Sequence, residues 1–355
     1  MGEPIDDSEF DGLVEAGADL TDKASTREAL PLDVKQLSGY ADFRGVGDSG
    51  WANTHQGTPR AATFGDALDK FDPTGTLIKG HVSYINWETV VGEQCKTFSN
   101  SYVPGRSYAF ISRKDNLLQA YARGFNLVGL SNNHTRDCAV PAAETLTLQS
   151  MGEVGAEGTL WAGLRADGKG GLDVKVGAFD VGDGVIAKVA FASAYIGSKR
   201  SCDLSVCADD VPALVKALQS ADADYRVLSL HSMDARTQAE LANIGADAVK
   251  NNRIDVVYGS GPHVWKPVRV VERSDGSKGV VFQSLGNFLH PALAAQAKNY
   301  IGRALFDRDH KLAQVQLVSV RNVGDRAELS SAAASSVAAN LAWKSMPKGV
   351  FANVK

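Results

Sequence analysis

Polar side chains that follow directly on a short apolar run place the strongest constraint on what this sequence can form. Residues 125–130 (Phe-Asn-Leu-Val-Gly-Leu) are mostly apolar and predict a short buried strand. Two carboxamides and an imidazole come just after it, at Asn132, Asn133 and His134. In open α/β sheets, the loops beyond the carboxyl ends of strands hold ligands and catalytic groups. The run and its polar end therefore predict a functional loop on an α/β sheet.

The same pattern recurs elsewhere in the chain. Further predicted strands end on a carboxylate or an imidazole, at Asp48, Glu88, His231 and His263. Asp, Glu, Asn and His are ligands for divalent metals, and the same groups perform acid/base chemistry. We expect these side chains to meet in one solvent-reachable cleft.

Helical and β-rich segments organise the rest of the sequence. Amphipathic runs predict helices, at residues 63–71, 115–123, 141–151, 211–218 and 237–250. Their alternation with strands predicts a wound α/β layer, and residues 174–191 predict hairpins of a second sheet. We expect an N-terminal peripheral arm over residues 1–39, a main domain over 40–325, and a C-terminal helix and tail over 326–355.

Charge and hydropathy narrow the range of partners. The net charge is -4 and the Lys and Arg residues form no cluster, which makes a nucleic-acid partner unexpected. No apolar run reaches the length of a membrane span, and residues 1–7 lack the features of a signal peptide. The even number of cysteines, and the close pair Cys202 and Cys207, favour disulfides in an oxidising compartment. Unpaired cysteines of a cytosolic protein remain the alternative.

Several motifs, in order, resemble the CapA family, which is named for poly-γ-glutamate capsule biosynthesis and shares the calcineurin-like metallophosphatase fold. The matching pieces are Gly47-Asp48, Asn86-Trp-Glu88, Ser131-Asn-Asn-His134, Ser229-Leu-His231, Pro262-His-Val264 and Ser284-Leu-Gly-Asn-Phe288. Their order and spacing over residues 42–288 make the resemblance specific. It implies a four-layer α/β/β/α sandwich, and a location outside the cytoplasm, periplasmic or secreted.

The resemblance also implies roles for the strand-end residues. It implies two divalent metals (Zn, Mn or Fe) that share a bridging carboxylate: the first held by Asp48, Glu88 and His263, the second by Glu88, Asn133 and His231. His134 would donate a proton to the leaving group, because the pKa of an imidazole lies near neutrality. Asp137 is three residues away and would orient it, or else cap the next helix. Asn287 would end a strand and shape the pocket, and His290 receives no functional role.

Departures from the family pattern reduce the ligand count. Gly50 stands where metallophosphatases have a histidine, and Ser260 and Gly261 stand where CapA chains usually have imidazoles. Each metal then keeps three protein ligands, which suffices for catalytic zinc with water but weakens binding. The site therefore looks degenerate, and a metal-free state is one expectation.

The expected function is hydrolysis of an envelope polymer or a peptide, assisted by metal. One alternative is a metal-independent acid/base enzyme, either a peptide epimerase or an amide-cleaving enzyme, that uses Asp48, Glu88, His134, His231 and His263. The other is a non-catalytic accessory protein of capsule biosynthesis. The expected partner is an anionic polymer, glycan or peptide, and the sequence leaves the oligomeric state open.

Overall fold

The computed structural model describes residues 38–52, 60–61, 63–95, 108–138, 146–155, 158–165, 172, 174–197, 202, 205–293 and 296–329. The expected N-terminal arm lies almost entirely outside these residues, and so does the expected C-terminal helix. No helix in the part of the chain that the structure describes has both the length and the apolar character needed to cross a bilayer.

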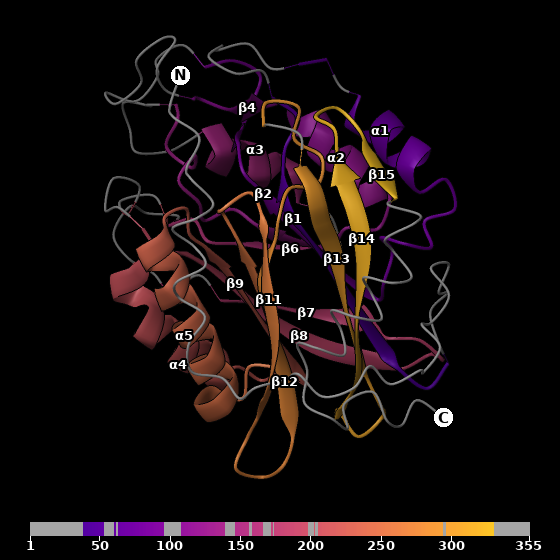
Figure 1. Cartoon of the computed structure of the whole chain (residues 1–355), viewed down its shortest axis with the longest axis vertical. Coiled ribbons are helices and arrows are strands. Elements are labelled where there is room, and N and C mark those ends of the chain that lie inside the picture. The colour runs from indigo at the N-terminus through magenta and orange to yellow at the C-terminus, as the bar shows by residue number, and fades with distance from the viewer. Residues whose placement is uncertain are drawn as a thin grey trace.

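Two β-sheets form the centre of the molecule (Figure 1). The seven-stranded sheet has the order β15-β14-β13-β1-β2-β5-β6. Its strands are β1 (Ala41–Ser49), β2 (Val82–Trp87), β5 (Leu127–Gly129), β6 (Leu160–Ala162), β13 (Gln296–Phe306), β14 (Leu312–Asn322) and β15 (Ala327–Leu329). Strands β1, β2, β5 and β6 are mutually parallel, whereas β13, β14 and β15 join β1 as an antiparallel meander.

The six-stranded sheet has the order β11-β12-β10-β9-β8-β7. Its strands are β7 (Lys175–Asp180), β8 (Ile186–Tyr195), β9 (Tyr225–His231), β10 (Val256–Ser260), β11 (Trp265–Glu272) and β12 (Lys278–Leu285). The inner strands run parallel and the two edge strands antiparallel. A short parallel pair, β3 (Val90–Val91) and β4 (Ile111–Ser112), lies apart from both sheets.

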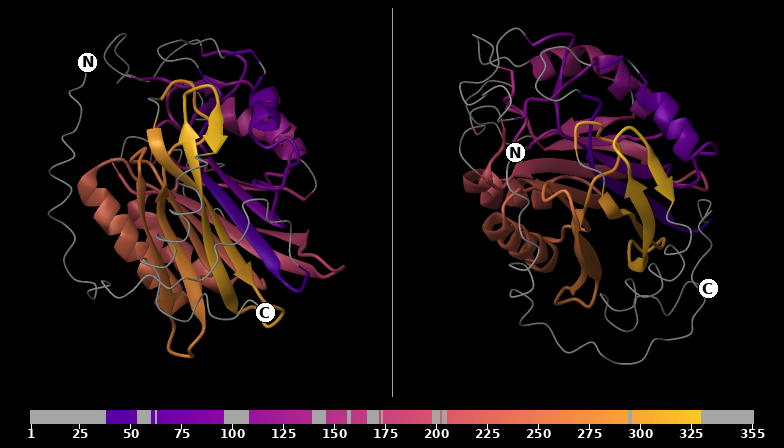
Figure 2. Two further views of the ribbon diagram at one scale, coloured as in Figure 1. Left: turned by 45° about the vertical axis from the view of Figure 1, so that its right-hand side comes forward. Right: turned by 45° about the horizontal axis from the view of Figure 1, so that its top comes forward.

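Helices cover the outer faces of both sheets (Figure 2). The seven-stranded sheet packs on α1 (Phe64–Phe71), α2 (Lys114–Ala122) and α3 (Leu146–Val154). The six-stranded sheet packs on α4 (Val211–Ser220) and α5 (Ala235–Asn252). These are the helices that the amphipathic runs predict, although α3 begins at Leu146 and the start of its predicted run lies outside the described residues.

Three apolar cores separate the four layers. In β2, Tyr84 points into the core between the sheets while its neighbour Ile85 packs on the helices, as the two-residue period of a strand requires. Phe43, Tyr258 and Phe282 also fill the core between the sheets. The α/β class and the α/β/β/α sandwich expected from the sequence are therefore confirmed.

Strand direction sets where polar groups gather. Parallel strands of both sheets, β1, β2 and β5 in one and β9 and β10 in the other, end at the same side of the sandwich. A bridge between Asp48 and Asn287 joins β1 to the segment after β12. A Cβ atom at Gly47 would lie 1.9 Å from the carbonyl oxygen of Gly286, so only glycine permits this approach.

Candidate functional site

The ends of these strands bring the predicted residues together. They come from five strands of two sheets: Asp48 in β1, Glu88 after β2, Asn133 and His134 after β5, His231 at the end of β9, and His263 after β10. The side chains of Asp48, Glu88 and His231 are fully buried, whereas the side chain of His263 is 22% exposed. Solvent therefore reaches the cluster beside His263.

Asp48 is held by donors on both oxygens. Asn86 Nδ2 donates to Oδ1 at 2.7 Å, and the backbone N–H of Gly261 donates to Oδ2 at 3.0 Å. His263 Nδ1 lies 3.2 Å from Oδ2. Burial would raise the pKa of Asp48, but the hydrogen bond from His263 and the charges of His231 and His263 outweigh it and lower the pKa. The carboxylate is thus ionised at neutral pH.

Glu88 is the unusual group of the site. Within the described part of the chain, neither of its buried carboxylate oxygens has a hydrogen-bond partner. Oε1 lies 3.5 Å from His231 Nε2, and Oε2 lies 3.8 Å from His263 Nδ1. Burial and the negative charge of Asp48 raise the pKa of Glu88 to about 8. A buried carboxylate without donors is costly, so the site is suited to a cation.

His263 owes its position to an unusual backbone. Its φ of 58° lies in the left-handed region, and Gly261, two residues earlier, has a φ of 115°. A Cβ atom at Gly261 would lie 2.1 Å from the carbonyl oxygen of Ser232. Position 261 therefore has no room for the imidazole that the resemblance to the CapA family led us to expect there. Burial alone would lower the pKa of His263, but the charges of Glu88 and Asp48 outweigh it and raise the pKa to about 9.

Lack of space also accounts for glycine at position 50, where the metallophosphatase pattern led us to expect a histidine. A Cβ atom there would lie 2.4 Å from the Thr89 side chain and 3.3 Å from the His290 ring. His290 is fully buried, and its Nε2 lies 3.5 Å from the carbonyl oxygen of Glu88. An imidazole from a distant part of the chain thus fills space beside Gly50, which sequence reasoning did not anticipate.

His231 is enclosed by polar partners. Nε2 lies 2.6 Å from Asn133 Oδ1, and Nδ1 lies 3.0 Å from Ser260 Oγ. Burial lowers the pKa of His231 to about 4. The ring is therefore neutral at physiological pH, with one nitrogen as donor and the other as acceptor.

His134 is paired with a carboxylate. Nδ1 lies 2.7 Å from Asp137 Oδ2, an oxygen that also accepts the backbone N–H of Phe110 at 2.6 Å. The Phe110 ring lies against the imidazole, with centroids 4.3 Å apart. Burial would lower the pKa of His134, but Asp137 and Glu88 outweigh it and raise the pKa. The orientation of His134 by Asp137 is as expected; the part played by Phe110 was not foreseen, because its segment has no clear period.

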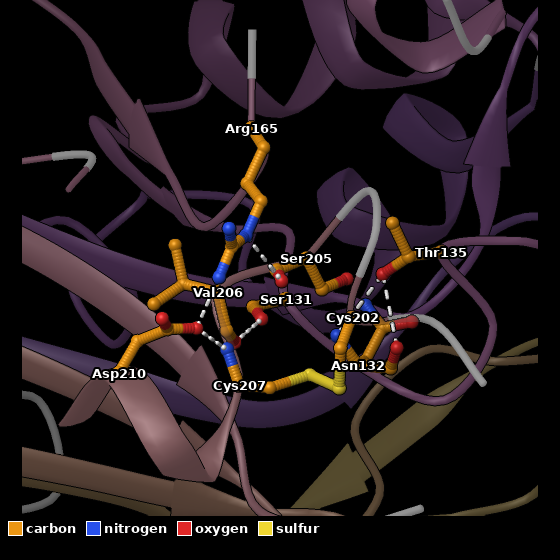
Figure 3. The surroundings of a disulfide bond; sticks show 9 residues. All are labelled: Ser131, Asn132, Thr135, Arg165, Cys202, Ser205, Val206, Cys207 and Asp210. Atoms are coloured by element: carbon orange, nitrogen blue, oxygen red, sulfur yellow. Dashed lines mark hydrogen bonds and ion pairs between the residues drawn. A yellow bond between two sulfur atoms is a disulfide. The ribbon is translucent and has the colours of Figure 1, made fainter. Parts of the chain in front are cut away.

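Disulfides frame the loop that carries Asn133 and His134. The structure pairs Cys95 with Cys138 and Cys202 with Cys207. Cys138 directly follows Asp137. At the other end of the loop, Ser131 Oγ donates at 2.8 Å to the carbonyl oxygen of Val206, beside the second disulfide (Figure 3). The pairing that the cysteines favoured is therefore present, and both disulfides support the loop.

The donor set fits a divalent cation. Asp48, Glu88 and His263 each offer one ligand atom, and these atoms lie within 4.8 Å of one another. Carboxylate oxygens and imidazole nitrogens suit zinc and other transition metals. The unpartnered oxygens of Glu88 are an independent reason for placing a positive charge there.

Fold and site together define the class: a two-sheet α/β protein with a carboxylate and imidazole cluster at its strand ends. Residues 46–292 match the model of the family described as bacterial capsule synthesis protein PGA_cap. Since this match covers more than half of the sequence, the chain belongs to that family, and the resemblance seen in the motifs is confirmed. A comparison with curated proteins gave no significant match.

Two solved structures are similar to this chain at low sequence identity. A novel phosphatase from Mycoplasma pneumoniae is 10% identical with a TM-score of 0.46, over 80% of this chain and 95% of that chain. A hypothetical protein from Thermus thermophilus is 14% identical with a TM-score of 0.45, over 79% of this chain and 99% of that chain. We base no functional conclusion on either similarity.

Proposed function

We propose that this chain is a divalent-metal-dependent hydrolase of capsule or envelope polymer metabolism. The observation that carries the proposal is Glu88, a fully buried carboxylate without a hydrogen-bond donor among the described residues, next to the ionised Asp48. Such a pair of carboxylates calls for a positive charge between them. Zinc, manganese and iron are the metals whose ligand preferences agree best with the set.

The residues of the site have separate roles in the proposed hydrolysis. Asp48, Glu88 and His263 would hold the cation, which when bound would supply polarisation of the scissile group and a lowered pKa of water. His134 Nε2 lies 3.9 Å from Glu88 Oε1, and Asp137, 2.7 Å from Nδ1, favours the protonated form of the ring and raises its pKa. His134 is therefore the group placed to protonate the leaving group.

The substrate in this proposal is an anionic polymer, such as poly-γ-glutamate, or a related glycan or peptide. The family supplies the link to capsule polymers. The bound cation, together with His134 and its raised pKa, would give the accessible side of the site a positive charge that suits an anionic chain. Paired cysteines agree with an extracytoplasmic location.

Chelation and substitution test the proposal. Metal-free protein and protein reloaded with zinc, manganese or iron would be assayed on poly-γ-glutamate, peptides and phosphoesters. We expect activity to vanish with the metal and to return on reloading. Glu88→Gln and His134→Ala should each reduce turnover by at least about a hundredfold. Glu240→Gln, an exposed glutamate of α5, serves as the matched control.

A metal-independent acid/base enzyme is the second candidate. It is supported by the juxtaposition of Glu88, whose pKa is raised to about 8, with His134, whose pKa is also raised. Activity that survives chelation but is lost in Glu88→Gln would favour it over the hydrolase. Binding of polymer that neither Glu88→Gln nor His134→Ala changes, without turnover in any protein, would favour an accessory role.

A further inference from the structure

We propose that this site binds one divalent cation, with Asn287 as its fourth protein ligand, and that His231 and Asn133 do not bind metal. The inference rests on the metal dependence proposed above and specifies the number of ions. It departs from the pair of metals that the family resemblance implies.

Asn287 is placed to complete the ligand set. It follows β12, is 1% exposed, and pairs with Asp48 through a β-bridge. Backbone hydrogen bonds fix its position. The backbone N–H of Asp48 donates to the carbonyl oxygen of Gly286 at 2.9 Å, and the backbone N–H of Asn287 donates to Asn299 Oδ1 at 3.0 Å. Its Oδ1 lies 3.0 Å from His263 Nδ1.

His263 Nδ1 faces more oxygen atoms than a single N–H group can satisfy. This nitrogen faces Asn287 Oδ1 at 3.0 Å, Asp48 Oδ2 at 3.2 Å and Glu88 Oε2 at 3.8 Å. An imidazole nitrogen carries at most one hydrogen, so it cannot donate to three oxygens. Two atoms bound to one ion at about 2.1 Å lie about 3.0 Å apart in octahedral geometry and about 3.4 Å apart in tetrahedral geometry. The two shorter separations fit these values, and the third needs a shift of a few tenths of an ångström.

The distance between His231 and Asn133 is different, although His231 Nε2 also lies 3.5 Å from Glu88 Oε1, a separation that two ligands of one ion can have. Nε2 of His231 and Oδ1 of Asn133 are 2.6 Å apart, which is closer than two ligands of one ion would be. The distance is that of a hydrogen bond. Nδ1 of the same ring accepts from Ser260 Oγ at 3.0 Å, so both ring nitrogens already have partners. A second ion would have to break the bond between His231 and Asn133.

The departures from the family pattern agree with a single ion. Gly50 leaves the first metal position without one of its usual ligands, and Asn287 supplies an oxygen in compensation. Ser260 lies where the resemblance to the CapA family led us to expect an imidazole, and its hydroxyl instead contacts the second nitrogen of His231. The first metal position thus gains Asn287 as a ligand. At the second position, His231 and Asn133 are already engaged in hydrogen bonds within the protein.

Calorimetric titration of the metal-free full chain with Mn²⁺ and with Zn²⁺, with elemental analysis after dialysis, tests the inference. We expect one ion per chain. Asn133→Ala and His231→Gln should keep this stoichiometry and bind within about threefold of the unsubstituted chain. Asn287→Ala should weaken binding by at least about tenfold. Asn287→Asp, which restores an oxygen ligand and adds charge, should bind at least as tightly as the unsubstituted chain.

Each other result overturns the inference. Two ions per chain, a stoichiometry that falls in His231→Gln, or unchanged affinity in Asn287→Ala would each contradict it while leaving the metal-dependent hydrolase intact. A chain that binds neither ion would defeat both proposals. Asn243→Ala, an exposed asparagine of α5, is the control, and circular dichroism confirms that each variant is folded.

Discussion

Replacing Glu88 by glutamine should change how the stability of the metal-free protein depends on pH. The pKa of Glu88 is raised from an ordinary 4.5 to about 8, chiefly by burial. The folded state therefore holds this proton more tightly than the unfolded chain does. The contribution of Glu88 to stability is complete below pH 4.5 and is lost as the pH rises to about 8.

The size of the effect follows from the shift. Each pKa unit corresponds to about 1.4 kcal/mol, so a rise from 4.5 to about 8 amounts to at most about 5 kcal/mol in the free energy of unfolding. That is a large share of the roughly 5–15 kcal/mol that stabilises a typical domain. The pKa of His263 is also raised, from an ordinary value of 6.5 to about 9. The contribution of His263 to stability is therefore also lost as the pH rises through this range. The charge of Glu88 contributes to this rise, so the shift of His263 becomes smaller in Glu88→Gln, and the difference between the two proteins reports Glu88 together with its coupling to His263.

Urea unfolding in the presence of a chelator, from about pH 5 to about pH 9, measures this difference. Near pH 5 the two proteins should be about equally stable, because glutamine resembles a protonated glutamate. Near pH 9 the variant should be more stable by several kcal/mol. Saturating metal should reverse the order, since only the unsubstituted chain gains the full binding energy. Parallel curves for Glu88→Gln and the unsubstituted chain would refute the reasoning, and Glu240→Gln should match the unsubstituted chain throughout.

Three further predictions concern groups around the site and at a distance from it. Replacing Cys202 and Cys207 by serine should lower turnover more than metal affinity, because their loop supports the segment after β5; an equal loss of both, by assay and titration, would contradict this. Asp42→Asn should lower the free energy of unfolding by about 3–5 kcal/mol in urea without changing metal binding, because it removes the buried carboxylate that pairs with two buried guanidinium groups; a loss below about 1 kcal/mol would contradict this. Asp137→Asn should lower the pKa of His134 and move the basic limb of the rate profile to lower pH; an unchanged imidazole titration by NMR would argue against the pairing.

Local patterns in the sequence predicted individual strands and helices, whereas the four-layer arrangement was implied by the resemblance to the CapA family. The apolar run that ends before Asn132 became β5, and the amphipathic run at residues 237–250 became most of α5. Polar groups at the ends of parallel strands could be expected to meet, since strand direction brings their ends to one side of the sandwich. The approach of Asp48, Glu88 and His263 follows from that rule.

Other parts of the site depend on contacts that no local pattern records. Asn287 comes close to His263 because the chain after β12 pairs with β1 in the other sheet. His290 fills the space beside Gly50 for the same reason. The hydrogen bond between His231 and Asn133 depends on the separation of two side chains, which spacing along the sequence does not set.

A crystal structure of the protein soaked with Mn²⁺ or Zn²⁺ would test the central claim most directly. The anomalous difference map should contain one peak, at about 2.0–2.4 Å from Asp48 Oδ2, Glu88 Oε2 and His263 Nδ1, with Asn287 Oδ1 as a further ligand. No peak between these atoms, in protein saturated with the metal, would contradict it.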